Sequence, residues 1–313
     1  MIKHPVVVIG LAVLLCTGAC TKQRNVQNSE GKINVTAVNF PAYDFARTIA
    51  GDRVNLVMLL PPAAESHSYE PTPSDILTIQ NSDIFIYTGG ESDDWVEQIL
   101  ESMDTASMDI ITLMGCVETV EEEVVEGMEE EEEEEEGPAY DEHVWTSPGN
   151  VKLIAEVIAE ELCKKDEANA AAYRQNAAEY LVRLDELDAA FKAVVEGAKR
   201  KTIVLADRFP FRYFADAYGL SYFAAFPGCS TETEPSAATV AFLINKIRAE
   251  NIPVVFHIEL SNEKMADTIS EATGAKKLLL HAAHNVSRDD FERGFTYLQL
   301  QQGNVDRLKE ALW

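Results

Sequence analysis

The chain has 313 residues, of which 53 are acidic and 26 basic, so its formal net charge at pH 7 is −27. This excess of negative charge argues against nucleic acid or an anionic membrane surface as a binding partner. Much of the excess is local, because residues 118–136 contain thirteen glutamates, eight of them consecutive from Glu129 to Glu136. The charge therefore describes one loop more than it describes the fold.

The N-terminus has the pattern of an export signal. Lys3 precedes an apolar run at residues 6–15, which is too short to span a bilayer, and small residues at 18–19 lead to Cys20. A cysteine directly after small residues resembles the bacterial lipobox, in which that cysteine is lipidated and becomes the first residue of the mature protein. We therefore expect a signal peptide at residues 1–19, lipidation of Cys20, and a polar, flexible tether at residues 20–31. A cleaved signal peptide without a lipid is the alternative.

Downstream of the tether, strand-like apolar runs alternate with helical patterns. In the first half, strands are predicted at residues 33–38, 54–60, 83–87 and 110–113, and helices at 42–51 and 93–103. In the second half, strands are predicted at 202–206, 222–226, 253–258 and 277–281, and helices at 211–218, 236–251, 263–273 and 291–312. This alternation predicts two α/β domains with mainly parallel sheets.

One long helix is predicted between the two halves. Its apolar residues are spaced by four and three in turn, which places them on one helix face. They are Tyr173, Ala177, Tyr180, Leu184, Leu187, Phe191 and Val194. We interpret this helix as a packing spine that runs beside both domains. The predicted organisation is an N-terminal half at 32–166 with an acidic loop at 118–137, a linking helix at 167–197 and a C-terminal half at 198–313.

Five of the six histidines lie downstream of the signal, and each falls at a predicted strand end or in a loop. They are His67, His143, His257, His281 and His284. In doubly wound domains, ligands bind in crevices beyond the carboxyl ends of strands. Both halves therefore offer imidazoles at edges that can face one another.

Two of these histidines lie in distinctive segments. His67 begins His-Ser-Tyr-Glu-Pro-Thr-Pro-Ser-Asp at residues 67–75, and His143 lies in Asp-Glu-His-Val-Trp-Thr-Ser-Pro at residues 141–148. Both segments resemble the ligand motifs of the metal-receptor lipoproteins of zinc and manganese ABC importers, which are TroA-like periplasmic solute-binding proteins. The resemblance covers essentially the whole chain and implies one imidazole ligand from each motif.

The resemblance implies a monomeric binding receptor, not an enzyme. Such a receptor captures a divalent transition metal between its two halves. It delivers the metal to an ABC permease and the ATPase of that permease, from the outer face of the bacterial cytoplasmic membrane.

The second half departs from the family pattern. The family places its third ligand, a His or Glu, just before a Phe-x-Tyr-Phe segment, which is residues 211–214 here. An ungapped comparison puts Arg208 at that position, and arginine has no lone pair to give a metal. Asp207 is then the predicted third ligand, and His281 falls where the family has a fourth ligand, an aspartate after a late strand. Alternative ligands are Glu259, His257, His284 and Cys229.

Imidazoles with one carboxylate suit Zn²⁺, whereas Mn²⁺ prefers more oxygen donors. Zinc is therefore favoured over manganese as the transported ligand.

The acidic loop is the remaining feature with a possible link to the metal. Its uninterrupted run is interpreted as a solvated block of like charges, with weak gathering of cations near the site as the sharper alternative. Zinc receptors of this family often carry a histidine-rich loop at this place. The residues of the run are Glu129, Glu130, Glu131, Glu132, Glu133, Glu134, Glu135 and Glu136.

Two other classes of function are weighed against the receptor. A zinc-dependent hydrolase needs an open metal coordination position, but the chain has no His-Glu-x-x-His helix, Gly-x-Ser-x-Gly elbow or Gly-rich phosphate loop. A surface adhesin is the second alternative, and no residue pattern argues for it.

Overall fold

The computed structural model describes residues 31–65, 67–128, 139–230 and 235–313. The predicted signal peptide, Cys20 and almost all of the tether lie outside the described residues. No helix in the described part of the chain combines the length and the apolar character that a membrane crossing requires.

The glutamate run of the acidic loop also lies outside the described residues, so both of its interpretations stay predictions. This applies to each of its members, Glu129, Glu130, Glu131, Glu132, Glu133, Glu134, Glu135 and Glu136.

The first half contains a four-stranded parallel sheet with the strand order β2-β1-β3-β4. Its strands are β1 (Asn34–Ala37), β2 (Asn55–Met58), β3 (Ile84–Tyr87) and β4 (Asp109–Thr112). All four residues of β3 are buried, as expected for a central strand covered on both faces.

The second half repeats this strand order. Its strands are β5 (Thr202–Val204), β6 (Ser221–Phe223), β7 (Val254–His257) and β8 (Lys276–Leu279). β5 pairs with β6 and β7 with β8, all in parallel, and a parallel bridge between Leu205 and Phe256 connects the two pairs. The resulting order β6-β5-β7-β8 matches that of the first half. The predicted α/β class with mainly parallel strands is confirmed.

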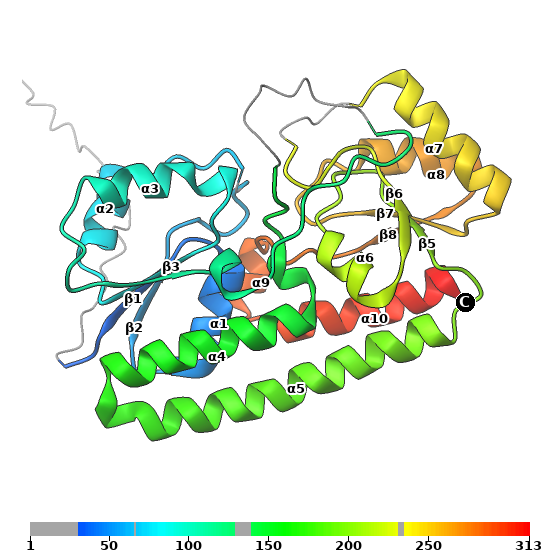
Figure 1. The fold of residues 1–313 in the computed structure, drawn as a ribbon. Helices are drawn as coiled ribbons and strands as arrows, with labels where there is room; N and C mark the ends of the chain where they lie inside the picture. The colour runs from blue at the N-terminus through cyan, green and yellow to red at the C-terminus, as the bar shows by residue number, and fades with distance from the viewer. Residues whose placement is uncertain (1–30, 66, 129–138, 231–234) are drawn as a thin grey trace, which may run out of the picture.

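Helices cover both sheets and connect the halves (Figure 1). They are α1 (Phe40–Ala50), α2 (Pro73–Gln80), α3 (Asp94–Glu101), α4 (Pro148–Lys165), α5 (Ala170–Glu196), α6 (Arg212–Tyr218), α7 (Ala237–Glu250), α8 (Lys264–Thr273), α9 (Arg288–Glu292) and α10 (Tyr297–Leu312).

The long helix α5 runs beside both halves. It has 27 residues, so it is about 40 Å long, and every residue of the predicted apolar stripe is buried. α5 packs against α1 and α4 in the first half and against α10 in the second. Figure 1 shows α5 beneath both sheets, with α4 above its first part and α10 above its last part. The spine predicted from the stripe is therefore present, with α4 and α10 as its neighbours.

Three helical predictions need correction. Neither α2 nor α4 was predicted from the sequence, and α4 is the main packing partner of the first part of α5. The predicted single helix at 291–312 is wrong, because the structure divides it into α9 and α10. Gly294 has a φ of 72°, and Thr296 forms a capping box with Gln299 that starts α10 anew.

The segment between α9 and α10 returns to the first half. The backbone N–H of Tyr297 donates to Asp44 Oδ2 at 2.7 Å, and the Tyr297 hydroxyl donates to the carbonyl of Trp145 at 2.7 Å. The Tyr297 ring also packs edge-on against Phe45 of α1. One apolar cluster consequently contains residues of both halves. The boundaries at residues 166 and 198 stay a prediction.

Substitutions of Leu184 and Val182 test how much the buried stripe of α5 contributes to the free energy of unfolding. Leu184 is 0% exposed and Val182 is 58% exposed, although both lie on α5. We expect Leu184→Ala to lower the free energy of unfolding by about 3 kcal/mol, because it leaves a cavity between packed helices. Val182→Ala should change it by less than about 0.5 kcal/mol. Urea denaturation followed by circular dichroism measures both; equal effects would contradict the role assigned to the buried stripe.

Candidate metal centre

Three imidazoles from separate loops meet between the two halves. His67 lies in the loop after β2, His143 lies just before the short 3₁₀ turn that leads into α4, and His284 lies in the loop after β8. Their ring centroids are 4.8–5.8 Å apart, and one ligand atom of each lies within 4.8 Å of the other two. Histidines of both halves thus form a cluster of a size that suits one metal ion.

His143 is fully buried and held by one carboxylate. Asp141 Oδ1 accepts the backbone N–H of His143 at 2.7 Å and its ring Nδ1–H at 3.0 Å. Because an ionised carboxylate only accepts, Nδ1 carries a proton, and in the neutral ring the lone pair is on Nε2. Nε2 is buried and has no hydrogen-bond partner among the described residues. A buried nitrogen left unpaired costs about 1–3 kcal/mol, so this atom is well placed to bind a ligand.

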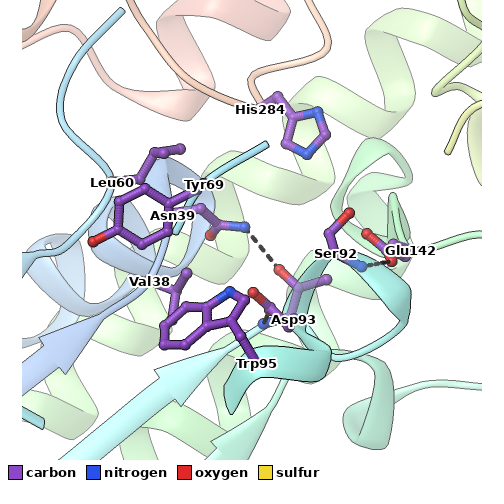
Figure 2. A pocket seen from close by; sticks show the side chains of 10 residues that line it. Val38, Asn39, Leu60, Tyr69, Ser92, Asp93, Trp95, Glu142 and His284 are labelled. Atoms are coloured by element: carbon purple, nitrogen blue, oxygen red, sulfur yellow. Dashed lines mark hydrogen bonds between the residues drawn. The ribbon is translucent and has the colours of Figure 1, made fainter. Parts of the chain in front are cut away.

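His67 is oriented in a similar way by a hydroxyl. Ser92 Oγ lies 2.7 Å from His67 Nδ1, which leaves Nε2 for the cluster. The backbone N–H of Ser92 donates to Glu142 Oε1 at 2.7 Å, and burial raises the pKa of Glu142 to about 7. Figure 2 shows Ser92 and Glu142 side by side in the pocket whose lining includes His284. Ser92 therefore links the His67 ring to the segment that carries His143.

The loop that carries His284 is held by Glu259 and Trp145. The two carboxylate oxygens of Glu259 accept the backbone N–H groups of Ala282 and His284 at 2.7 and 2.8 Å. Trp145 Nε1 donates to the carbonyl of Ala282 at 2.8 Å. The Trp145 ring packs against His143 and His284, with centroid distances of 5.4 and 5.0 Å. Glu259 thus positions the backbone of the loop, and Trp145 positions two of the rings.

The loops of His67 and His284 are also joined directly. The backbone N–H of Ala63 donates to the carbonyl of Val286 at 2.8 Å. Asn285 Nδ2 donates to the carbonyls of Pro61 and Ala64 at 2.8 and 2.9 Å. Ala63 and Ala283 have φ values of 69° and 62°, a conformation that costs a residue with a Cβ free energy. The contacts across the halves hold this strained backbone at the site.

Electrostatics favour neutral imidazoles at two of the three positions. Burial, then His143 and Arg208, lower the pKa of His67 to about 2. Burial, then His143, His67 and Arg208, hold the pKa of His284 well below its usual range. Burial, the largest single cause, lowers the pKa of His143 as well, but Asp141, Glu142 and Glu122 together outweigh it, so the pKa of His143 is raised. His67 and His284 therefore keep their lone pairs free of protons at neutral pH.

Asp207 and His281, the two ligands predicted from the second half, are not part of this cluster. The Nδ1 atom of His281 accepts the backbone N–H of Ala283 at 3.0 Å, so its lone pair is used within its own loop. Asp207 accepts the backbone N–H of Arg208 at 3.0 Å and also bonds to Ser261. Among the described residues, the cluster contains His284 in place of both, and we use His284 in the proposal below.

The remaining alternatives are placed as follows. His257 Nδ1 lies 3.1 Å from the carbonyl of Ile258, in the neighbourhood of Glu263. The backbone N–H of Cys229 donates to Glu122 Oε1 at 2.7 Å, and burial raises the pKa of the Cys229 thiol well above its usual range. A thiol that resists ionisation is a poor metal ligand.

The three imidazoles line a cavity of about 20 Å³, which is space for one water molecule or one ion. Glu65, Arg208 and Glu259 line the same cavity. Arg208, at the position where the family has its third ligand, donates from Nη1 to the carbonyl of Ser230 at 3.1 Å. Its Nη2 lies 3.2 Å from Glu65 Oε2.

Sequence reasoning missed three residues of the site. They are Ser92, Asn285 and Gly228. A Cβ on Gly228 would lie 2.9 Å from the carbonyl oxygen of Phe209 and 3.2 Å from His143 Nδ1, so glycine lets the backbone approach the back of the His143 ring. The Pro-Gly pair after β6 is a turn signal, but it does not reveal the distant ring.

A family model described as "Zinc-uptake complex component A periplasmic" matches residues 35–311. The chain belongs to this family. It is 31% identical over 303 residues to the high-affinity zinc uptake system protein ZnuA of Bacillus subtilis (strain 168), covering 96% of this chain and 94% of that protein. The resemblance predicted from the two histidine motifs is therefore confirmed.

Two solved structures have the same fold. The Zn(II)-bound ZnuA-like domain of Streptococcus pneumoniae AdcA is 28% identical with a TM-score of 0.75, over 90% of this chain and 99% of that chain. The metal-dependent lipoprotein YcdH of Bacillus subtilis is 29% identical with a TM-score of 0.77, over 90% of this chain and all of that chain.

The Asp141–His143 pair can be tested without a metal. We expect Asp141→Asn to lower the pKa of His143, because burial is then opposed only by the weaker effects of Glu142 and Glu122. Titration of the imidazole signals by NMR measures this shift. Asp75→Asn, which alters a carboxylate bonded to Tyr69 and Thr72, is the control and should leave His143 unchanged. A His143 pKa that is the same in wild type and Asp141→Asn would contradict the assignment.

Proposed function

We propose that this protein is an extracytoplasmic receptor that binds one Zn²⁺ ion through His67, His143 and His284. It delivers the ion to an ABC import permease and the ATPase of that permease. The buried Nε2 of His143, unpaired among the described residues and facing two other imidazoles, carries the proposal. Membership of the zinc-uptake family supports it.

The donor set favours zinc over manganese. Three imidazole nitrogens match the ligands of a tetrahedral zinc site, whereas Mn²⁺ prefers oxygen donors. Zn–N bonds of about 2.0–2.1 Å place ligand nitrogens roughly 3.3 Å apart in a tetrahedron. Since the three ligand atoms already lie within 4.8 Å of one another, small ring movements bring them to a common ion.

The cavity argues for a receptor over a hydrolase. A hydrolytic zinc site needs room for a substrate beside the metal-bound water. A cavity of about 20 Å³ accommodates the ion and a single small ligand. The cargo itself bridges the halves, so its release requires the His284 loop to separate from the loop that carries His67.

We further propose that the receptor is a monomer held at the outer face of the bacterial cytoplasmic membrane by a lipid on Cys20. The lipobox-like sequence before Cys20 supports this anchor, and the similar YcdH of Bacillus subtilis is described as a lipoprotein. Metabolic labelling with a radioactive fatty acid tests it: wild type should incorporate the label and Cys20→Ala should not.

The ligand set can be resolved by substitution. We expect wild type to bind one Zn²⁺ per chain and His284→Ala to bind it at least about a hundredfold more weakly, because a protein ligand is lost. Competition with a chromophoric chelator measures both affinities. His257→Ala and Asp207→Asn are the controls and should retain wild-type affinity. A hundredfold loss in Asp207→Asn, with none in His284→Ala, would restore the ligand set predicted from the sequence.

The pH dependence of binding follows from the same pKa directions. His67 and His284 carry no proton that zinc must displace, while His143 holds one below its raised pKa. We therefore expect zinc affinity to fall about tenfold per pH unit between pH 6 and pH 5, the slope for one displaced proton. Chelator competition across this range measures the slope. A fall of a hundredfold or more per unit would show that further imidazoles become protonated.

A further inference from the structure

Arg208 forms a wall of the metal cavity. Its side chain is 12% exposed, and it lines the cavity together with the three imidazoles. A guanidinium stays charged and has no lone pair, so it cannot ligate a metal. A Zn²⁺ ion bound by the three histidines would therefore lie next to a fixed positive charge.

The three imidazoles also leave coordination incomplete. A four-coordinate zinc ion needs one more donor, and the cavity wall offers two carboxylates, those of Glu259 and Glu65. Both oxygens of Glu259 already accept backbone N–H groups of the His284 loop. Glu65 lies 3.2 Å from Arg208, and its side chain is 45% exposed, so it has room to move.

A carboxylate between the ion and the guanidinium resolves both problems. One oxygen supplies the missing donor, and the negative charge offsets the repulsion between Zn²⁺ and Arg208. Arginine is well suited to this task, because its planar N–H groups bind a carboxylate with two parallel hydrogen bonds.

We propose that Arg208 makes the fourth position of the site an anionic one, occupied by a carboxylate that the guanidinium holds against the metal. The proposal rests on the zinc-receptor function. The carboxylate comes either from Glu65 or from a small carboxylate in solution, which enters the same place beside Arg208. In either case Arg208 is a specificity-determining residue, because it selects a charged oxygen donor for the position that the three imidazoles leave open.

The test uses the mature chain with Zn²⁺ and with Co²⁺, whose visible absorption reports the fourth ligand. Zinc affinity by chelator competition and the Co²⁺ spectrum are measured with added sodium acetate. Sodium perchlorate of equal ionic strength is the comparison. The variants are Arg208→Gln, Arg208→Lys and Glu65→Gln.

A matched ion pair provides the control. Arg212 Nη1 lies 3.5 Å from Glu123 Oε2, with side-chain exposures of 21% and 49%, and neither residue lines the cavity. Arg212→Gln and Glu123→Gln should match wild type in both measurements.

Two results would support the proposal and identify the source. If Glu65 is the ligand, acetate has no effect on wild type, and Glu65→Gln weakens zinc binding about tenfold or more and makes the Co²⁺ spectrum respond to acetate. If solution supplies the ligand, acetate changes the wild-type spectrum and strengthens zinc binding, and Glu65→Gln keeps this response. In both cases Arg208→Gln removes the effect of the carboxylate on zinc affinity and on the Co²⁺ spectrum, whether that effect is seen on introducing Glu65→Gln or on adding acetate. Arg208→Lys retains part of this effect.

Other results would overturn it. Wild-type zinc affinity and a Co²⁺ spectrum that respond to neither acetate nor Glu65→Gln would show that neither Glu65 nor a carboxylate from solution occupies the position, which contradicts the proposal. Carboxylate dependence that is unchanged in Arg208→Gln would remove Arg208 from the role. A wild-type chain that binds no zinc would instead contradict the receptor function itself, so the two failures are distinguishable.

Discussion

The burial of one apolar helix face determines how the two halves of this protein are placed. α5 packs its stripe against α1 and α4 at one end and against α10 at the other. Fully burying a large apolar side chain contributes about 1.5–3 kcal/mol, so residues such as Tyr180, Leu184 and Phe191 make this packing strong. A helix has little freedom to bend between its ends. The sheets beside it are placed so that the loops at their carboxyl ends face one another.

Polar contacts then refine what the apolar packing has placed. Asp141 orients the ring of His143, Ser92 that of His67, and Glu259 the loop of His284. Partners of this kind fix the ring orientation of a metal-ligating histidine and the nitrogen that carries its lone pair. Because the three supports come from separate segments, the site depends on the whole fold more than on any one motif.

The charge around the cavity suits a cargo that enters and leaves. His67 and His284 offer a divalent ion lone pairs that are free of protons, and Asp141 supplies negative charge behind the third imidazole, His143. Arg208 lines the same cavity, and its positive charge would repel a divalent ion bound there. A receptor must bind its cargo tightly but also release it, and a positive charge beside the ion limits how tightly the histidines alone can hold it.

The sequence by itself determined the features whose partners are close along the chain. The 3.6-residue period of α5 is local, and Asp141 and His143 are two residues apart, so the spine and the two histidine motifs were predictable. α4 was missed although its pattern is equally local. The division of the last helix was also local, at Gly294 and Thr296.

Tertiary structure decided the remainder of the site. Whether His281 or His284 faces the cluster depends on a turn with positive φ at Ala283 and on Glu259, 25 residues before His284. Ser92 lies 25 residues after His67, and Asn285 bonds to carbonyls more than 200 residues before it. The direction of a side chain at the end of a strand follows from backbone angles and from distant hydrogen-bond partners. No local spacing encodes either, so the third imidazole and the place of Arg208 became evident only once the chain was folded.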